Sequence, residues 1–67
     1  MKNKIKIERA VHSFTQDELA QKIHVSRQTI HAIEAGKYVP STVLALRMAR
    51  LFQKPVEEIF ELEQEDL

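Results

Sequence analysis

The most distinctive polar side chains of this sequence lie in one short segment near its middle. Arg27 can donate a forked pair of hydrogen bonds to guanine, Gln28 can pair with adenine, and His31 can donate or accept a hydrogen bond. Ser26 and Thr29 add hydroxyl groups at a point where the start of a helix favours phosphate. This set is typical of a surface that contacts nucleic acid, but an Arg-Gln-Thr sequence also suits an ordinary solvated helix end.

Two helix starts would position this segment. Thr15 and Glu18 have the spacing of a capping box, in which each side chain bonds the backbone amide of the other residue. Ser26 is a second N-cap residue. We therefore predict two short helices, over about 16–23 and 27–35, joined by a tight turn. Two helices joined in this way have the form of a helix-turn-helix.

The second predicted helix is amphipathic. Ile30 and Ile33 would point to one side, and Arg27, Gln28 and His31 to the other. In a DNA-binding helix-turn-helix, the second helix enters the major groove with its exposed N-terminal residues facing the bases. The exposed side chains are therefore candidates for base contacts.

The rest of the sequence is also largely helical. Gly36 suits the left-handed position after a helix. Apolar residues with a 3.6-residue period predict a helix over 42–52. Pro55 opens a short helical turn over about 56–59, and the alternation at 60–63 predicts a short strand.

The N-terminal segment is predicted to be a helix over about 4–12 after a brief extended start. Ile7, Ala10 and Val11 would share one helical face. The extended start could pair with the C-terminal strand.

Length and charge limit the function. A single domain of 67 residues buries only about 60% of the surface that its unfolded chain exposes. Residues 1–56 carry a net charge of +6 and residues 57–67 a net charge of −6, so a polyanionic partner is possible for the basic body. The absence of cysteine and of any run long enough to span a membrane fits a cytoplasmic protein.

The apolar residues near the C-terminus are too many for so short a chain to bury. We therefore expect a homodimer whose dimerising part covers about 51–63. The candidate contacts are Leu51, Phe52, Val56, Ile59, Phe60 and Leu62.

Metal binding and catalysis have little support. The spacing of His12, His24 and His31 matches no common zinc pattern. There is no Ser-His-Asp spacing or glycine-rich phosphate loop, and so small a chain could hardly enclose a substrate pocket. We therefore expect no enzyme activity, no cofactor and no small-molecule ligand.

Four segments carry a family resemblance: TQDELA, VSRQTI, IEAGKYVPS and LALRMAR. In this order and spacing they resemble the phage repressor/Cro type of helix-turn-helix regulator, the Xre family, from about Asn3 to Leu62. The resemblance implies a mainly α fold, a five-helix lambda-repressor-like domain with a small two-stranded antiparallel sheet from the chain ends. It also implies the compact subgroup, whose members are typically homodimers.

The resemblance assigns roles at the matching positions. Arg27, Gln28 and His31 would read bases. Arg9 and Glu34 match a pair that forms a buried salt bridge. The residues expected to hold the DNA backbone are Gln16, Ser26, Thr29, Lys37 and Tyr38.

Three positions depart from the family pattern. His24 stands in the turn where the family usually has Gly, at a point that tends to need a left-handed backbone. His31 stands where close relatives often have Asn, which changes the expected base preference. Glu8 replaces an apolar residue, so we expect Ile7 or Val11 to take over its packing.

The sequence therefore predicts a homodimeric, sequence-specific DNA-binding regulator that acts as a repressor, with its helix-turn-helix at about 16–35. It would bind a palindromic operator with its two reading helices about 34 Å apart. The alternative is an antitoxin-type interaction module that binds a partner protein and DNA together, for which only the tail 61–67 is available.

Overall fold

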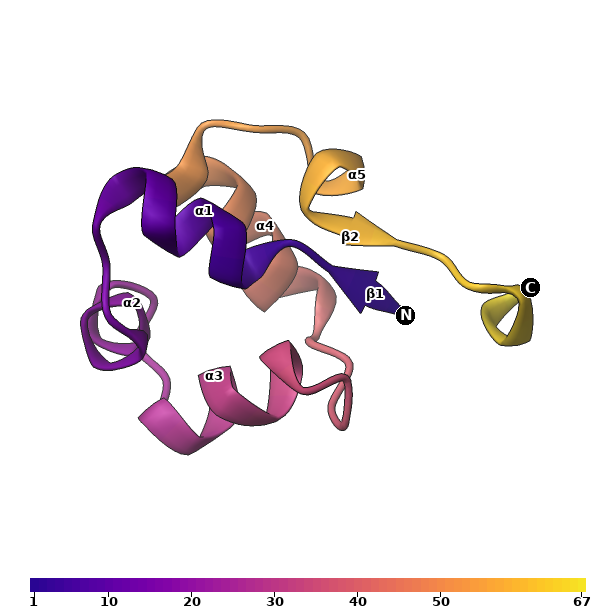
Figure 1. The fold of residues 1–67 in the computed structure, drawn as a ribbon, viewed down its shortest axis with the longest axis horizontal. Helices are drawn as coiled ribbons and strands as arrows, with labels where there is room; N and C mark the ends of the chain where they lie inside the picture. The colour runs from indigo at the N-terminus through magenta and orange to yellow at the C-terminus, as the bar shows by residue number, and fades with distance from the viewer.

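Five helices and a two-stranded sheet make up the computed structural model, which covers residues 1–67 (Figure 1). This arrangement confirms the predicted fold class. The elements in chain order are β1 (Lys2–Asn3), α1 (Ile5–His12), α2 (Gln16–Lys22), α3 (Arg27–Glu34), α4 (Thr42–Phe52), α5 (Val56–Ile59), β2 (Phe60–Glu61) and a 3₁₀ turn, η1 (Gln64–Asp66).

Side-chain caps set the starts of α2, α3 and α4. Thr15 accepts a hydrogen bond from the amide of Glu18 at 3.0 Å, and Glu18 accepts one from the amide of Thr15 at 2.9 Å. Ser26 and Ser41 each accept a bond from the amide three residues later. Each cap satisfies an amide that the helix itself leaves unpaired, and the predicted capping box is confirmed.

Left-handed residues end the helices and form the turn of the helix-turn-helix. Gly36 has φ 76° after α3, and His24 has φ 62° between α2 and α3, as predicted for both. Ser13 and Gln53 adopt the same conformation after α1 and α4.

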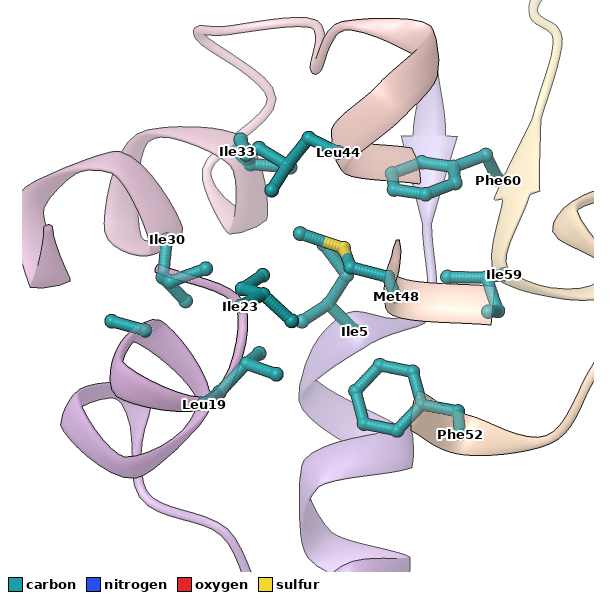
Figure 2. Close-up of a cluster of buried hydrophobic side chains, with 11 residues drawn as sticks. Ile5, Leu19, Ile23, Ile30, Ile33, Leu44, Met48, Phe52, Ile59 and Phe60 are labelled. Carbon is teal, nitrogen blue, oxygen red and sulfur yellow. The ribbon is translucent and has the colours of Figure 1, made fainter. Parts of the chain in front are cut away.

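The core draws side chains from all five helices and from β2 (Figure 2). Ile30 and Ile33 anchor α3 in it, and α4 contributes one residue per turn. The buried apolar residues are Ile5, Leu19, Ala20, Ile23, Ile30, Ile33, Leu44, Met48, Phe52, Ile59 and Phe60. Truncating a buried isoleucine to alanine typically costs about 2–5 kcal/mol, so α3 is held firmly.

The chain ends meet in the sheet, as predicted. β1 and β2 are antiparallel, with Asn3 opposite Phe60. The C-terminal turn then folds back, and the N-terminal ammonium of Met1 lies 2.9 Å from Glu63 Oε1 and 3.1 Å from Asp66 Oδ2. This C-terminal turn was not predicted from the sequence. None of the helices has the length and apolar character that a membrane span requires.

The predicted packing of α1 is wrong. Ile7 and Val11 are both exposed, whereas Glu8 is buried. The inward positions of α1 are those of Ile5 and Glu8, one turn apart, because Lys54 approaches from the turn after α4 and neutralises the carboxylate at 2.6 Å. A charged residue therefore occupies the core position that Ile7 or Val11 was expected to fill.

The reason given for the predicted dimer contacts is also wrong in part. Phe52, Ile59 and Phe60 are buried in the core of their own chain, so they have little surface left for a partner. Leu51 and Val56 are only partly buried, and Leu62 is exposed. The short chain buries more of its C-terminal apolar surface than its length suggested, because β2 brings Phe60 back onto the core.

Candidate nucleic-acid interface

Helix α3 lies at the edge of the fold, with α1 and α2 on one side (Figure 1). Arg27, Gln28 and His31 are all exposed, while Ile30 and Ile33 are buried. The three polar side chains therefore share the solvent face of a helix whose other face is fixed in the core. That face offers one fork of donors, one amide and one imidazole, which match the edges of bases in a major groove.

The first turn of α3 has the features of an anion contact. Ser26 Oγ caps the amide of Thr29 at 3.1 Å and lies 3.0 Å from Thr29 Oγ1. The first amides of a helix lack intrahelical partners, and the helix dipole makes this end positive. The hydroxyl of Ser26 is exposed beside them, so this turn could contact a phosphate.

An ion pair fixes α3 to α1. Arg9 Nε lies 2.6 Å from Glu34 Oε2, and Arg9 Nη2 donates to Glu34 Oε1 at 3.1 Å. Arg9 Nη1 also donates to the carbonyl oxygen of Phe14 at 3.0 Å. The hydrogen bonds to Glu34 raise the pKa of Arg9, so the guanidinium stays charged. This is the pair that the resemblance implied.

Gln16 joins the same cluster from the start of α2. Its Nε2 donates to Glu34 Oε1 at 3.3 Å. The side chain therefore braces α3, and its partial exposure leaves it beside the surface where a DNA backbone would pass.

The loop after α3 carries the remaining two predicted backbone contacts. Lys37 and Tyr38 are exposed directly after the left-handed Gly36. The amide of Lys37 donates to the carbonyl of Ala32 at 2.9 Å, which fixes the loop to the end of α3. Lys37 has no ion-pair partner in the structure, so its charge is free for a phosphate.

A groove of about 650 Å³ runs between α1 and α3. Its lining residues are Asn3, Lys4, Lys6, Ile7, Arg9, Gln16, His31, Glu34 and Ala35. No role for Lys4 or Lys6 was predicted from the sequence. The alternating lysines of the N-terminal segment KNKIK were a visible signal, but their position beside α3 depends on the tertiary fold.

The three histidines have separate environments. His12 stacks between Phe14 and Phe52, with ring centroids 5.6 Å and 5.5 Å away. His24 forms the left-handed turn, and His31 lies on the exposed face of α3. The structure has no group of three or more His, Cys, Asp or Glu side chains that could hold a metal ion.

Comparisons with known proteins agree on one family. Residues 5–59 match the family model described as helix-turn-helix. The chain is 53% identical, over 98% of its length and all of the relative, to an uncharacterized HTH-type transcriptional regulator of Methanocaldococcus jannaschii. It is 46% identical to one of Bacillus subtilis over 98% of this chain and all of that relative. It is 45% identical to one of Archaeoglobus fulgidus over its full length and 94% of that relative.

Proposed function

The chain belongs to the Xre-type helix-turn-helix family of DNA-binding transcriptional regulators, and we propose that it is a repressor that binds a palindromic operator as a homodimer. The observation that carries this proposal is α3, whose polar face is exposed while Arg9 and Gln16 hold its far end at Glu34. A rigid base-reading helix needs no rearrangement on binding. Repression requires only that the protein occupy a promoter. The proposed protein is cytoplasmic and binds promoter DNA there.

The proposed contacts divide into two kinds. Arg27, Gln28 and His31 read base edges from the exposed face of α3. The backbone contacts position the protein and carry no sequence information. They come from Gln16, Ser26, Thr29, Lys37 and Tyr38.

The proposed dimer interface consists of apolar side chains that are exposed in the single chain. Val39, Val43, Leu46 and Leu62 are each more than half exposed. Val39 and Leu46 line an apolar groove of about 240 Å³ together with Val56 and Met1. Leu62 precedes Glu63, whose carboxylate pairs with the ammonium of Met1, a residue that lines this groove. A second copy covering this face would remove these side chains from water.

The alternative function, a module that binds a partner protein through its acidic tail, has less support. Glu63 and Asp66 already pair with the N-terminal ammonium, and Asp66 caps the amide of Glu63 at 2.8 Å. These carboxylates are therefore engaged within the chain.

Selection of bound sequences from a random duplex library, at two salt concentrations, tests the proposed function directly. We expect a palindrome whose half-sites lie about ten base pairs apart. Binding that depends on salt but enriches no sequence would contradict specific reading by α3.

Two substitutions then separate the two kinds of contact. Arg27→Ala should weaken binding by about 1–3 kcal/mol and relax the preference at one base position. Lys37→Ala should weaken binding to all sequences alike and flatten the salt dependence. Equal losses of specificity from both variants would contradict the assigned roles.

Sedimentation tests the dimer face. Leu46→Glu and Leu62→Glu should each give monomers, because each would place a carboxylate in the apolar contact. Val11→Glu is a matched control, since Val11 is also exposed but lies on α1. Dimers that survive both of the first two substitutions would move the interface elsewhere.

A further inference from the structure

Two lysines of the N-terminal segment stand beside α3 without a role. Lys4 and Lys6 are exposed and line the α1 wall of the groove whose other wall includes His31 and Ala35. Neither lysine has an ion-pair partner in the structure. In Figure 1, the N-terminal half of α1 lies next to the C-terminal half of α3. The two lysines therefore border the proposed base-reading helix.

Two contacts fix the lysines relative to α3. Before them, Asn3 Nδ2 donates to the carbonyl oxygen of Ile33 at 2.8 Å. After them, Arg9 pairs with Glu34. The segment that carries the two lysines is thus bonded at both ends to α3, at Ile33 and at Glu34. Any shift of α3 would carry the lysines with it. A segment held in this way is preorganised for a ligand that contacts both walls.

The charges of this groove favour an anion. Arg9 and Glu34 neutralise each other, so the uncompensated charges of the residues that line this groove are those of Lys4 and Lys6. Lys4 also borders a neighbouring groove that carries Glu57, Glu58 and Glu61, so Lys6 is the less compensated of the two. Both lysines lie at the N-terminal end of α1, where the helix dipole is itself positive and cations are unfavourable. An anion in the groove would relieve this repulsion.

We propose that Lys4 and Lys6 bind a backbone phosphate of the DNA that α3 reads, so that α1 acts as a second phosphate clamp. The inference rests on the proposed function and extends its surface to a helix outside the helix-turn-helix. Gln16, already assigned to the backbone, lines the same groove, so one stretch of the sugar-phosphate chain can contact both helices. The volume of about 650 Å³ is within the range of pockets that hold small molecules, which suffices for a phosphate and its sugar.

The test compares two double variants that remove the same charge. Lys4→Gln with Lys6→Gln removes the proposed clamp. Lys22→Gln with Arg50→Gln is the control, because these residues line a separate basic groove of about 300 Å³ between α2 and α4. Affinity for the selected operator is measured by fluorescence anisotropy from 50 mM to 300 mM salt, after circular dichroism has shown that both variants are folded.

The clamp variant should lose affinity by on the order of tenfold near 0.1 M salt, because the two lysines share one phosphate. The slope of log affinity against log salt should fall by about 1, with the preferred sequence unchanged. The control should keep the wild-type slope. An unchanged slope in the clamp variant would overturn the inference, and so would an equal fall in the control, which would mean that any surface cation serves.

The two levels of proposal fail differently. If the wild-type protein binds no duplex DNA, both the proposed function and the clamp are wrong. If the wild-type protein binds and Arg27→Ala relaxes its sequence preference, but the clamp variant binds as well as wild type, only the clamp is wrong.

Discussion

Two neighbouring residues of α1 form ion pairs that differ in how completely they are satisfied. The Arg9 and Glu34 side chains are 15% and 10% exposed, and two hydrogen bonds join them in a fork. Phe14 supplies a further acceptor for Arg9, and Gln16 a further donor for Glu34. This pair connects α1 to the helix that we propose reads DNA.

The second pair connects α1 to the turn after α4 and is one-sided. Lys54 Nζ lies 2.6 Å from Glu8 Oε2, but Glu8 Oε1 is buried without a partner. The Glu8 side chain is 3% exposed, whereas that of Lys54 is 41% exposed. The Glu8 carboxylate is therefore removed from water, whereas the Lys54 side chain is still partly hydrated.

The two ion pairs differ in how far their hydrogen bonds offset the cost of removing the charges from water. Desolvating an ion pair is repaid only when its geometry is good and its remaining polar atoms are bonded. The Arg9 pair meets this condition, and the orphan oxygen of Glu8 does not. The satisfied pair therefore holds the orientation of α3, and we expect the Glu8 pair to add no stability beyond that of an apolar residue.

The largest effect should come from Arg9→Ala. The substitution leaves the part-buried carboxylate of Glu34 with Gln16 as its only side-chain donor, and it removes the bond to Phe14. We expect the free energy of unfolding in urea to fall by about 3–5 kcal/mol. Glu34→Gln is the milder comparison, because an amide can still accept a bond from Arg9. A loss below about 1 kcal/mol would show that Glu34 rehydrates when its partner is removed.

Lys54→Ala should have the next largest effect. It leaves Glu8 buried with neither oxygen bonded to a side chain. Because the Lys54 side chain is 41% exposed, its truncation lets water reach Glu8, so we expect a loss of only about 1–3 kcal/mol in the same measurement, the usual cost of a buried unsatisfied polar group. Lys37→Ala is the control, since Lys37 is also an exposed loop lysine and has no ion pair. Equal losses of stability in the two variants would mean that the Lys54–Glu8 pair does not stabilise the fold.

Local signals made most of the fold predictable from the sequence. The starts of α2, α3 and α4 depend on side chains within three residues of each amide, such as Thr15 and Ser26. The stop at Gly36 depends on its own backbone. The exposed face of α3 follows from the spacing of Ile30 and Ile33 alone.

Long-range contacts account for what the sequence did not show. The inward face of α1 depends on Lys54, which is 46 residues from Glu8 in the chain. The burial of Phe60 depends on the pairing of the two chain ends. The position of Lys6 beside α3 depends on how α1 packs, so the candidate site was predicted within the helix-turn-helix, its loop and, through the family resemblance, at Arg9, but not at the N-terminal lysines. The roles of Arg27, Gln28 and His31 remain predictions.

Glu8→Leu should leave the free energy of unfolding unchanged or raise it, unlike the two substitutions above. Leucine removes the orphan oxygen and leaves Lys54 free to return to water, where 41% of its side chain already lies. We expect a variant that is equal to wild type or more stable by about 1 kcal/mol. Ile7→Leu is a matched control on the exposed face of α1. A clear loss of stability would show that the Glu8 pair is worth more than the apolar packing that replaces it.

The smallest effect is a loss of stability at alkaline pH. It should come from the Lys54–Glu8 pair and not from the Arg9–Glu34 pair. The hydrogen bond to Glu8 raises the pKa of Lys54 above its ordinary value of 10.5, against the opposing effect of desolvation. A group whose pKa is higher in the folded state adds stability that is full below the unfolded value and is lost as the pH rises through the folded one. Arg9 stays charged throughout this range, so its pair is unaffected.

The measurement is the melting temperature of wild type, Lys54→Arg and Glu8→Leu between pH 9 and 11.5, a window chosen around the ordinary lysine value. The wild-type melting temperature should fall more steeply with pH than that of either variant. Arginine keeps its charge beside Glu8, and leucine removes the carboxylate that raises the lysine pKa. All other lysines are shared by wild type and Glu8→Leu, so the difference between these two curves isolates the Lys54 pair. Parallel curves would mean that Lys54 titrates alike in the folded and unfolded chain, and the contrast between the two pairs would then rest on geometry alone.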